Sequence, residues 1–475
     1  MPSREDESLL EDSIAEWRSY LSRRQAVRAV DADELEDHLR TQLAALQESG
    51  LAEDEAFLIA VKRIGDLDSV AREFAQEYSE RLWKRLVLSA GPGAAAGRGR
   101  KEAGVAVGLA IAAAALFKLP ELFGIRLHAT AADAAFYEGL GLKLWPTAAA
   151  ESFYARNLAL FVLPLLAGFF AWKRGLARAG VFRLAAPFVV GALAVNVLPF
   201  APRGYTEALA ALHLPLALWL AVGFAYAGGL WRAHEPRMNY IRFSGEWLIY
   251  FALIGLGGMA LMASTMFVFG AIGLNPERLL QSWILPCGAM GAVIIAAWLV
   301  EAKQSVIENM APVLTLLFTP LFTLLLLAFL ATMLWTGSAI DVKREVLIGF
   351  DLLLVVVVAL ILYSISARDP GRAPGFFDGL QLLLVVCALL VDAFALWAIS
   401  ARISEFGVTP NRVAALGENL ILLVNLAGSG ALYARFLGGR APLLRLERWQ
   451  TSYLPVYAVW AWIVVLAFPP LFGFR

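Results

Sequence analysis

The sequence is poor in charge, cysteine and histidine. Of its 475 residues only 17% are charged and 59% are hydrophobic, while two are cysteine and four are histidine. So large an apolar share excludes an ordinary soluble domain and predicts an integral membrane protein. Cys287 and Cys387 each lie in an apolar run, where an unpaired cysteine acts as a small hydrophobe, so no disulfide framework or cysteine-based metal site is predicted. His128 and His213 lack partners at metal-ligand spacing, so we expect no zinc site.

Charge is unevenly distributed along the chain although the formal net charge is zero. Residues 1–90 hold 12 Lys/Arg and 20 Asp/Glu, so the remainder carries the opposite, basic excess. The N-terminal stretch is strongly charged and has no apolar core of the kind that a signal peptide needs. We therefore expect an acidic cytoplasmic head in front of a basic membrane body.

Residues 1–90 predict a small helical bundle, because apolar residues recur every three or four positions between helix caps. Asp31 starts a capping-box spacing, and Gly50 and Gly65 are expected to end helices. The predicted inward-facing stripes are Leu10, Ile14, Trp17 and Leu21; Leu35, Leu39, Leu43 and Leu46; Phe57, Ala60, Val61 and Ile64; and Val70, Phe74 and Tyr78.

Three motifs in this region resemble the permease prefix domain found before bacterial membrane proteins, some of them transporter permeases. They are Glu36-Asp-His-Leu39, then Glu55-Ala-Phe57, then Arg63-Ile-Gly-Asp66 leading to Val70-Ala-Arg-Glu-Phe74. The region is also similar to the small helical domain attached to certain envelope-signalling proteins. The resemblance covers nearly all of residues 10–78. It implies a docking or regulatory module with a cytoplasmic or membrane protein as partner. It does not imply an enzyme.

Residues 91–102 are rich in glycine and arginine and predict a flexible basic linker. Beyond it, over residues 103–475, the apolar runs have the length needed to cross a hydrocarbon core of about 30 Å. The sequence therefore predicts an all-α, polytopic transmembrane helical bundle surrounded by the lipid bilayer. Eleven spans are expected, near 103–123, 157–172, 182–200, 207–231, 247–270, 283–301, 311–335, 346–365, 377–399, 413–435 and 453–470.

The orientation of these spans follows from their Lys and Arg residues. Fourteen of these residues fall in loops on the side of the N-terminal head and nine in loops on the other side. Because positive residues are retained on the cytoplasmic side, this bias predicts a cytoplasmic N-terminus.

Three acids interrupt successive spans: Asp351, Asp392 and Glu418, all in the outer half of the membrane or near its midplane. A carboxylate at the centre of a spanning helix costs roughly 2.5–3.5 kcal/mol, so a partner, a cavity or a function has to offset it. One interpretation is a cation or proton site that trades a proton for a solute. The other is that the acids pair across helices and fix the packing. The full candidate binding cluster is Asp351, Asp392, Glu418, Asn419, Asn425, Arg402 and Arg412.

Two segments resemble the bacterial membrane family known as domain of unknown function 4153. They are Arg402-Ile-Ser-Glu-Phe-Gly-Val-Thr-Pro-Asn-Arg412, and Phe153-Tyr-Ala-Arg-Asn157 ahead of Leu160-Phe-Val-Leu-Pro164. The resemblance spans most of residues 103–470 and implies a multi-pass protein of the bacterial inner (plasma) membrane, without an assigned chemistry. In the first segment, Gly407 and Pro410 suit a tight turn, Thr409 or Asn411 could cap the next helix, and Arg412 could meet an acid or a phosphate.

Three functions remain open. The first is permease-like transport of a small solute or ion, and the second is a membrane sensor or assembly partner that acts through residues 1–90. The third, a lipid-linked glycosyl or phospho-transferase, is disfavoured because the long outer loop at 124–156 lacks the adjacent acids that hold a metal. The sequence has no phosphate-binding loop, nucleophile elbow or aromatic-interleaved basic patch, so no cofactor, no catalytic residues and no nucleic-acid partner are predicted.

Overall fold

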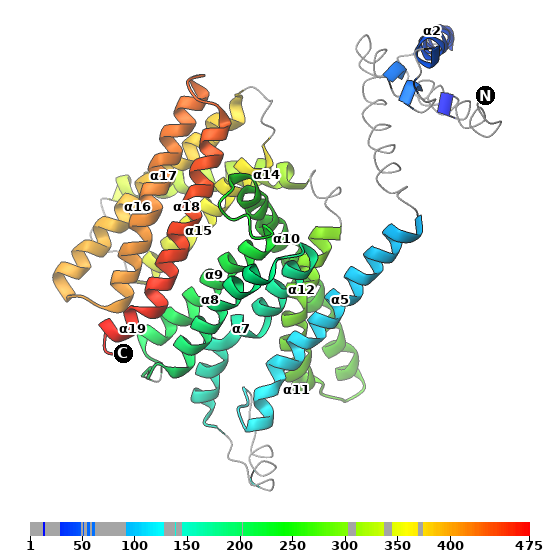
Figure 1. Cartoon of the computed structure of the whole chain (residues 1–475). Coiled ribbons are helices and arrows are strands. Elements are labelled where there is room, and N and C mark those ends of the chain that lie inside the picture. The colour runs from blue at the N-terminus through cyan, green and yellow to red at the C-terminus, as the bar shows by residue number, and fades with distance from the viewer. Residues whose placement is uncertain are drawn as a thin grey trace. The chain divides into compact units, whose positions relative to one another are not determined.

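A computed structural model describes residues 13–14, 29–48, 51, 55–57, 59–61, 92–127, 138, 145–201, 203–302, 310–336, 344–368 and 374–475. These residues form helices and turns but no strand, which confirms the predicted all-α class (Figure 1). The chain divides into two compact units, Met1–Lys101 and Glu102–Arg475.

The first unit is described in part. Helix α2 spans Ala29–Glu48, so it begins two residues before Asp31, which had been expected to start the helix cap. The stripe residues that are described are buried, as the apolar periodicity predicts: Ile14, Leu39, Leu43, Leu46, Phe57, Ala60 and Val61. The fourth predicted helix, with Val70, Phe74 and Tyr78, lies outside the described residues.

The prediction of a flexible linker at 91–102 is wrong from Pro92 onward, because Pro92–Lys118 forms the continuous helix α5. Alanine, arginine and lysine have high helix propensities, and adding a residue to an existing helix is far easier than starting one. The apolar run after residue 102 supplies that helix, so it extends back through the glycines to Pro92. Proline is well tolerated at this first helical position.

Further helices follow along the chain. They are η1 (Leu119–Phe123), α7 (Thr147–Lys173), α8 (Arg178–Val197), α9 (Tyr205–Tyr226), α10 (His234–Ala271), α11 (Glu277–Leu279), η2 (Leu280–Ile284), α12 (Leu285–Ala302), α14 (Met310–Thr336), α15 (Arg344–Ala367), α16 (Phe376–Phe406), α17 (Pro410–Leu437), α18 (Leu443–Leu466) and α19 (Phe468–Leu471).

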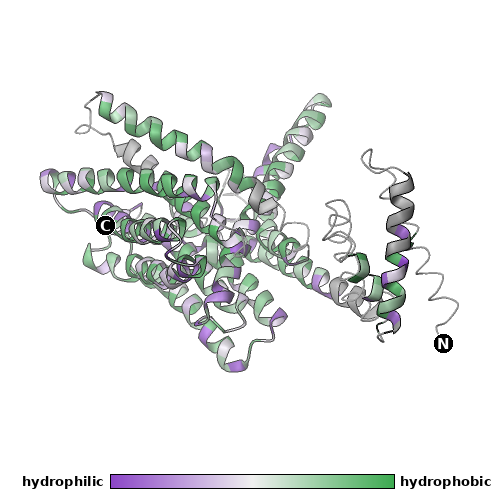
Figure 2. Cartoon of the chain, turned by 90° about the horizontal axis from the view of Figure 1, so that it is seen from above, coloured by the Kyte–Doolittle hydropathy of each residue, from purple (hydrophilic) through white to green (hydrophobic). Residues whose placement is uncertain are grey.

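Within the described residues, nine helices are long and apolar enough to cross a membrane, against eleven expected spans. The two remaining spans, 346–365 and 453–470, also fall on helices. The apolar part of α15 is Asp351–Ala367, which is shorter than the nine, and α18 begins with several polar and charged residues. Apolar surfaces dominate these helices along their length, and polar residues gather at their ends (Figure 2). The protein is an integral membrane protein.

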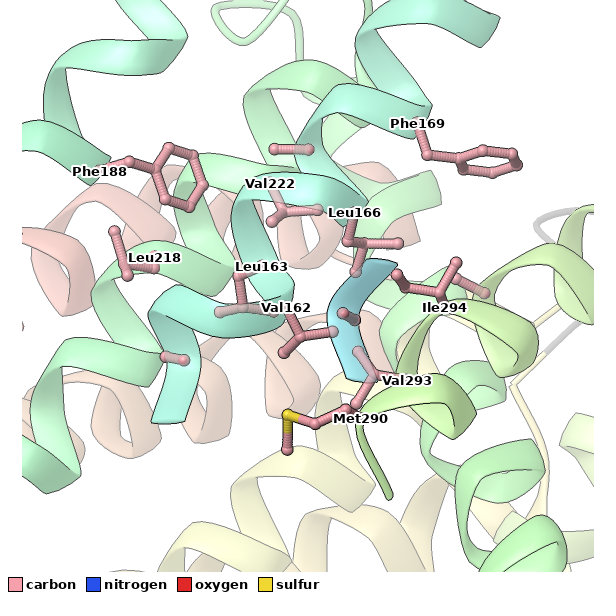
Figure 3. Close-up of a cluster of buried hydrophobic side chains, with 14 of the residues drawn as sticks. Val162, Leu163, Leu166, Phe169, Phe188, Leu218, Val222, Met290, Val293 and Ile294 are labelled. Carbon is pink, nitrogen blue, oxygen red and sulfur yellow. The ribbon is translucent and has the colours of Figure 1, made fainter. Parts of the chain in front are cut away.

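The second unit has two large hydrophobic cores. The first core draws on α5, α7, α8, α9, α10 and α12, which we call the first helix group. Among the described residues, Val465 of α18 is its one fully buried member from later in the chain, and Trp462 packs alongside. Figure 3 shows its centre, where Leu166 of α7, Val222 of α9 and Ile294 of α12 point toward one another. The second core draws mainly on α14–α18, the second helix group, with Met238 and Ile241 of α10.

Helix α9 lies at the boundary of the two helix groups, because it packs against α7 and α8 of its own group and against α18 and α17 of the second (Figure 1). Within the second helix group, α16 packs most extensively against α17. The carboxylate of Glu301 on α12, almost fully buried, binds Lys173 at 3.0 Å and Arg174 at 3.0 Å on α7. The first helix group is therefore fastened internally by buried charge as well as by apolar packing.

Candidate functional site

Two residues of the predicted cluster, Asp351 and Asn419, are joined directly. The Asn419 amide donates a hydrogen bond to Asp351 Oδ1 at 2.8 Å and another to the Ala415 carbonyl at 2.8 Å. Asn419 is fully buried. The contact ties α15 to α17, so residues 68 positions apart along the chain meet at membrane depth.

Asp392 on α16 lies beside this pair and close enough to Asp351 for the two carboxylates to repel each other. Its side chain is 0% exposed, and neither carboxylate oxygen has a hydrogen-bond partner among the described residues. A buried carboxylate without a donor is not stable as a bare anion. Burial without a donor therefore favours the neutral, protonated form of the Asp392 carboxyl group over the bare anion.

Glu418, next to Asn419 on α17, points in the other direction and contacts α9. Its Oε1 atom lies 2.7 Å from Nε2 of His213, and Nδ1 of the same imidazole lies 2.8 Å from the Leu209 carbonyl. The Glu418 side chain is 33% exposed, whereas that of His213 is 9% exposed. Glu418 also lies near enough to Asp351 for their charges to interact. The acids thus form a series across α16, α15 and α17 that ends at α9.

This series crosses the boundary between the two helix groups, since His213 belongs to the first and Glu418 to the second. A small apolar cluster, Leu209, Ala414, Val464 and Phe468, covers one end of it, with Val413, Trp460 and Phe472 packed alongside. Leu209 and Ala414 each lie four residues before His213 and Glu418 on their helices, so the cluster lies one turn away from that contact. Helix α19 and the α16–α17 connector lie at this same end of the bundle (Figure 1).

Asn425 does not join the acids, although it is on the same helix. Its amide donates to Gln450 Oε1 at 3.1 Å, Gln450 donates to Ser429 at 2.6 Å, and Ser429 donates to the Asn425 carbonyl at 2.7 Å. All three side chains are buried. The network is complete within α17 and α18, so Asn425 fastens these two helices together.

The two predicted arginines lie at the connector. Arg412 donates to the carbonyls of Phe406 at 3.0 Å and Gly407 at 2.7 Å, and its guanidinium lies over the Phe406 ring. Its guanidinium therefore satisfies the carbonyl end of α16. Arg402 is partly exposed and lies ten residues beyond Asp392, which is about 15 Å along α16.

The turn between α16 and α17 matches most of its sequence signals. Gly407 has φ 78°, a left-handed conformation that glycine adopts without strain, and Pro410 occupies the first turn of α17. Thr409 is the residue before the helix, but its side chain makes no capping hydrogen bond. Asn411 follows Pro410 inside the helix and cannot act as the cap.

Sequence reasoning missed His213 as a member of this site. It was weighed only as a metal ligand, and its partner Glu418 is 205 residues away. A second polar cluster was also missed: Gln381 on α16 donates to Thr319 on α14 and to Ser364 on α15, each at 2.8 Å. Neutral Gln, Thr and Ser side chains in apolar runs give no sequence signal as strong as an acid.

A metal centre is not formed by these groups. Across the part of the chain that the structure describes, no set of three or more His, Cys, Asp or Glu side chains converges as metal ligands would. Comparison with family models, with curated proteins and with solved structures found no match to this chain. The site's chemistry alone therefore has to support a function.

Proposed function

We propose that the membrane unit is a permease-like carrier that exchanges a proton for a small solute or ion at the Asp351, Asp392 and Glu418 site. The observation that carries the proposal is Asp392, a fully buried carboxylate without a hydrogen-bond donor. Keeping an acid at this depth costs roughly 2.5–3.5 kcal/mol, and a purely structural role would supply it with a partner. Asn425, at a similar depth in the next helix, has such partners.

The position of the site supports transport. Solute sites in membrane carriers lie near the midplane between helix groups, and rocking of one group against the other exposes them to each side in turn. Here the series of acids ends on a contact between the two helix groups, each built around its own core. Apart from Val465 and the α10 residues Met238 and Ile241, the buried core residues of each group lie on their own side of this boundary.

A proton fits the site better than a multivalent cation. A divalent metal needs several oxygen ligands converging on one point, and the described acids do not converge in that way. A series of single carboxylates with an imidazole at its end is typical of proton relays in membrane proteins. We therefore assign the proton as the coupling ion and leave the solute to experiment.

The N-terminal unit is proposed to be a cytoplasmic regulatory or docking module. Its motifs resemble the permease prefix domain, and the described part of that resemblance folds as buried helical stripes. The excess of Lys and Arg in loops on the same side supports a cytoplasmic N-terminus in the bacterial inner membrane. The domain-of-unknown-function resemblance of the membrane unit supports the same location.

The experiment has two stages. Native mass spectrometry of the protein released gently from its own membranes is compared between wild type and the Asp392→Asn/Glu418→Gln variant. We expect a small molecule that wild type retains and the variant loses. That compound is then added to protein in liposomes that contain a pH-sensitive dye, and wild type is expected to move protons with it while Asp392→Asn does not.

Glu235→Gln is the matched control, because Glu235 is an exposed acid at the start of α10. It should behave as wild type in both stages. Identical small-molecule content in wild type and the double variant, with no proton movement in either, would make the acids structural. A protein partner retained equally by both forms would then favour the sensor or assembly function.

A further inference from the structure

The contact between His213 and Glu418 fixes where a proton has to be. Nδ1 of His213 lies 2.8 Å from the Leu209 carbonyl, which can only accept, so Nδ1 carries a hydrogen. Nε2 lies 2.7 Å from Glu418 Oε1, a distance at which one of the two atoms must donate. The donor is either a protonated imidazole facing a carboxylate or a protonated Glu418 facing a neutral imidazole. In both cases one proton lies between the residues.

Loss of that proton removes the hydrogen bond. A neutral imidazole whose Nδ1 is already protonated presents a lone pair at Nε2, and an ionised Glu418 presents another. Two acceptors then face each other at low dielectric, where an unmade polar contact is costly. Protonation of both residues, by contrast, keeps a donor at Nε2, so the contact survives at low pH.

The location of the contact gives this change a mechanical consequence. His213 lies on α9 in the first helix group, and Glu418 lies on α17 in the second. The apolar cluster of Leu209, Ala414, Val464 and Phe468 lies one turn away, at the same end of the boundary. A third of the Glu418 side chain is left uncovered by the rest of the protein, whereas His213 is almost fully covered.

We propose that His213 and Glu418 form a latch, a hydrogen bond that is made only while a shared proton is bound and that then adds to the apolar contacts between the two helix groups at this end of the bundle. The latch is a second proton-binding position, distinct from Asp392. It rests on the placement of Glu418 in the polar site proposed above. Its state can be measured without any solute or flux, so its failure and that of the transport proposal are distinguishable.

Among the described residues, the hydrogen bonds of the latch side chains are those to each other and to the Leu209 carbonyl. Asp351 on α15 acts on Glu418 through its charge, as noted above. Two of the remaining titratable groups on helices packed against α9 are engaged in ion pairs on α7: Arg156 binds Glu207, and Lys173 binds Glu102 and Glu301. The others on α7 and α8 are Glu151, Tyr154, Arg178 and Arg183. Those on α10, α17 and α18 are His234, Glu235, Arg237, Tyr240, Arg242, Glu246 and Tyr250; Arg412, Tyr433 and Arg435; and Arg445, Glu447, Arg448, Tyr453 and Tyr457. Helix α19 has none.

The test measures the distance between the two helix groups as pH is changed. Spin labels are placed at Tyr205→Cys, the exposed first residue of α9, and at Val408→Cys, exposed in the α16–α17 connector, in full-length protein lacking Cys287 and Cys387. Pulsed electron resonance in lipid nanodiscs gives the distance distribution. We expect a single short distance at low pH and a longer one at high pH, with the ratio of closed to open forms falling about tenfold or more.

Two variants give the latch a donor that does not titrate. Glu418→Gln offers an amide N–H to the bare Nε2, and His213→Gln offers one to the Glu418 carboxylate, so each should stay closed at every pH. Either variant serves if the other fails to accumulate. His234→Gln is the matched control, since it removes an imidazole from α10, and it should respond as wild type does. A wild-type distance that ignores pH, or a wild-type response in the Gln variants, would overturn the latch.

Discussion

Asp392 and Asn425 are both fully buried polar side chains on adjacent helices, yet their surroundings differ. Asn425 has its hydrogen bonds supplied by Gln450 and Ser429, whereas neither oxygen of Asp392 has a partner among the described residues. A satisfied buried network stabilises a fold, and an unsatisfied group destabilises it. A buried polar side chain therefore stabilises helix packing at Asn425, whereas at Asp392 it indicates a candidate site.

This contrast predicts opposite effects on stability. Asp392→Asn removes the ionisable group at nearly constant shape, so the unfolding temperature should stay the same or rise, as is common when a functional group is replaced. Asn425→Leu removes the amide that donates to Gln450 Oε1, so this buried acceptor loses its donor and the change should cost about 1–3 kcal/mol. Thermal unfolding of the purified proteins, followed by tryptophan fluorescence, measures both. A marked loss of stability in Asp392→Asn would show that the acid holds the fold together.

Between helices, α17 and α18 meet through a regular pairing of glycine with tryptophan. A Cβ added at Gly417 would overlap the Trp460 ring, and one added at Gly428 would overlap the Trp449 ring. The two glycines are eleven residues apart, and so are the two tryptophans, which is three helical turns in each case. Close approach of these antiparallel helices thus depends on two glycines, and the first lies beside Glu418.

Gly417→Ala is therefore expected to push α18 away and to destabilise the protein by about 1–3 kcal/mol, the usual cost of overpacking. Gly258→Ala is the matched control, because nothing lies within 4 Å of a Cβ at that position, and it should be neutral or slightly stabilising. Thermal unfolding again provides the measurement. In a Trp460→Leu background the cost of Gly417→Ala should shrink, and a cost that is unchanged there would contradict the proposed clash.

Sequence patterns located the helices well. A segment that crosses lipid has to be apolar, long enough to span and internally hydrogen-bonded, so each span can be recognised from its own residues. They misjudged residues 91–102, where Gly and Arg indicated a linker although Ala and the following apolar run extend a helix through it. The acids could be recognised one by one, since a charge in an apolar run stands out. Their arrangement could not, because the contact of His213 with Glu418 depends on how helices 205 residues apart pack, and no local spacing encodes that.

For the molecule as a whole, orientation in the membrane determines which end of the bundle the latch faces. The positive residues predict that the α16–α17 connector lies outside and the α17–α18 turn inside. Val408 and Arg440 are exposed in these two segments. In protein lacking the native cysteines, a membrane-impermeant maleimide should label Val408→Cys on intact spheroplasts and label Arg440→Cys only after permeabilisation. The reverse pattern would place the N-terminal unit outside the cytoplasm.

The near-separation of the two cores also has a consequence for biosynthesis. A chain emerges from the ribosome in order, and the first core takes all of its residues except Val465 from positions 106–300. Once α12 has entered the bilayer, that core is already almost complete, while α14–α18 have not yet been inserted. Assembly can therefore proceed as two successive events. The acids would come together only in the second, when α15, α16 and α17 are inserted against the finished surface of α9.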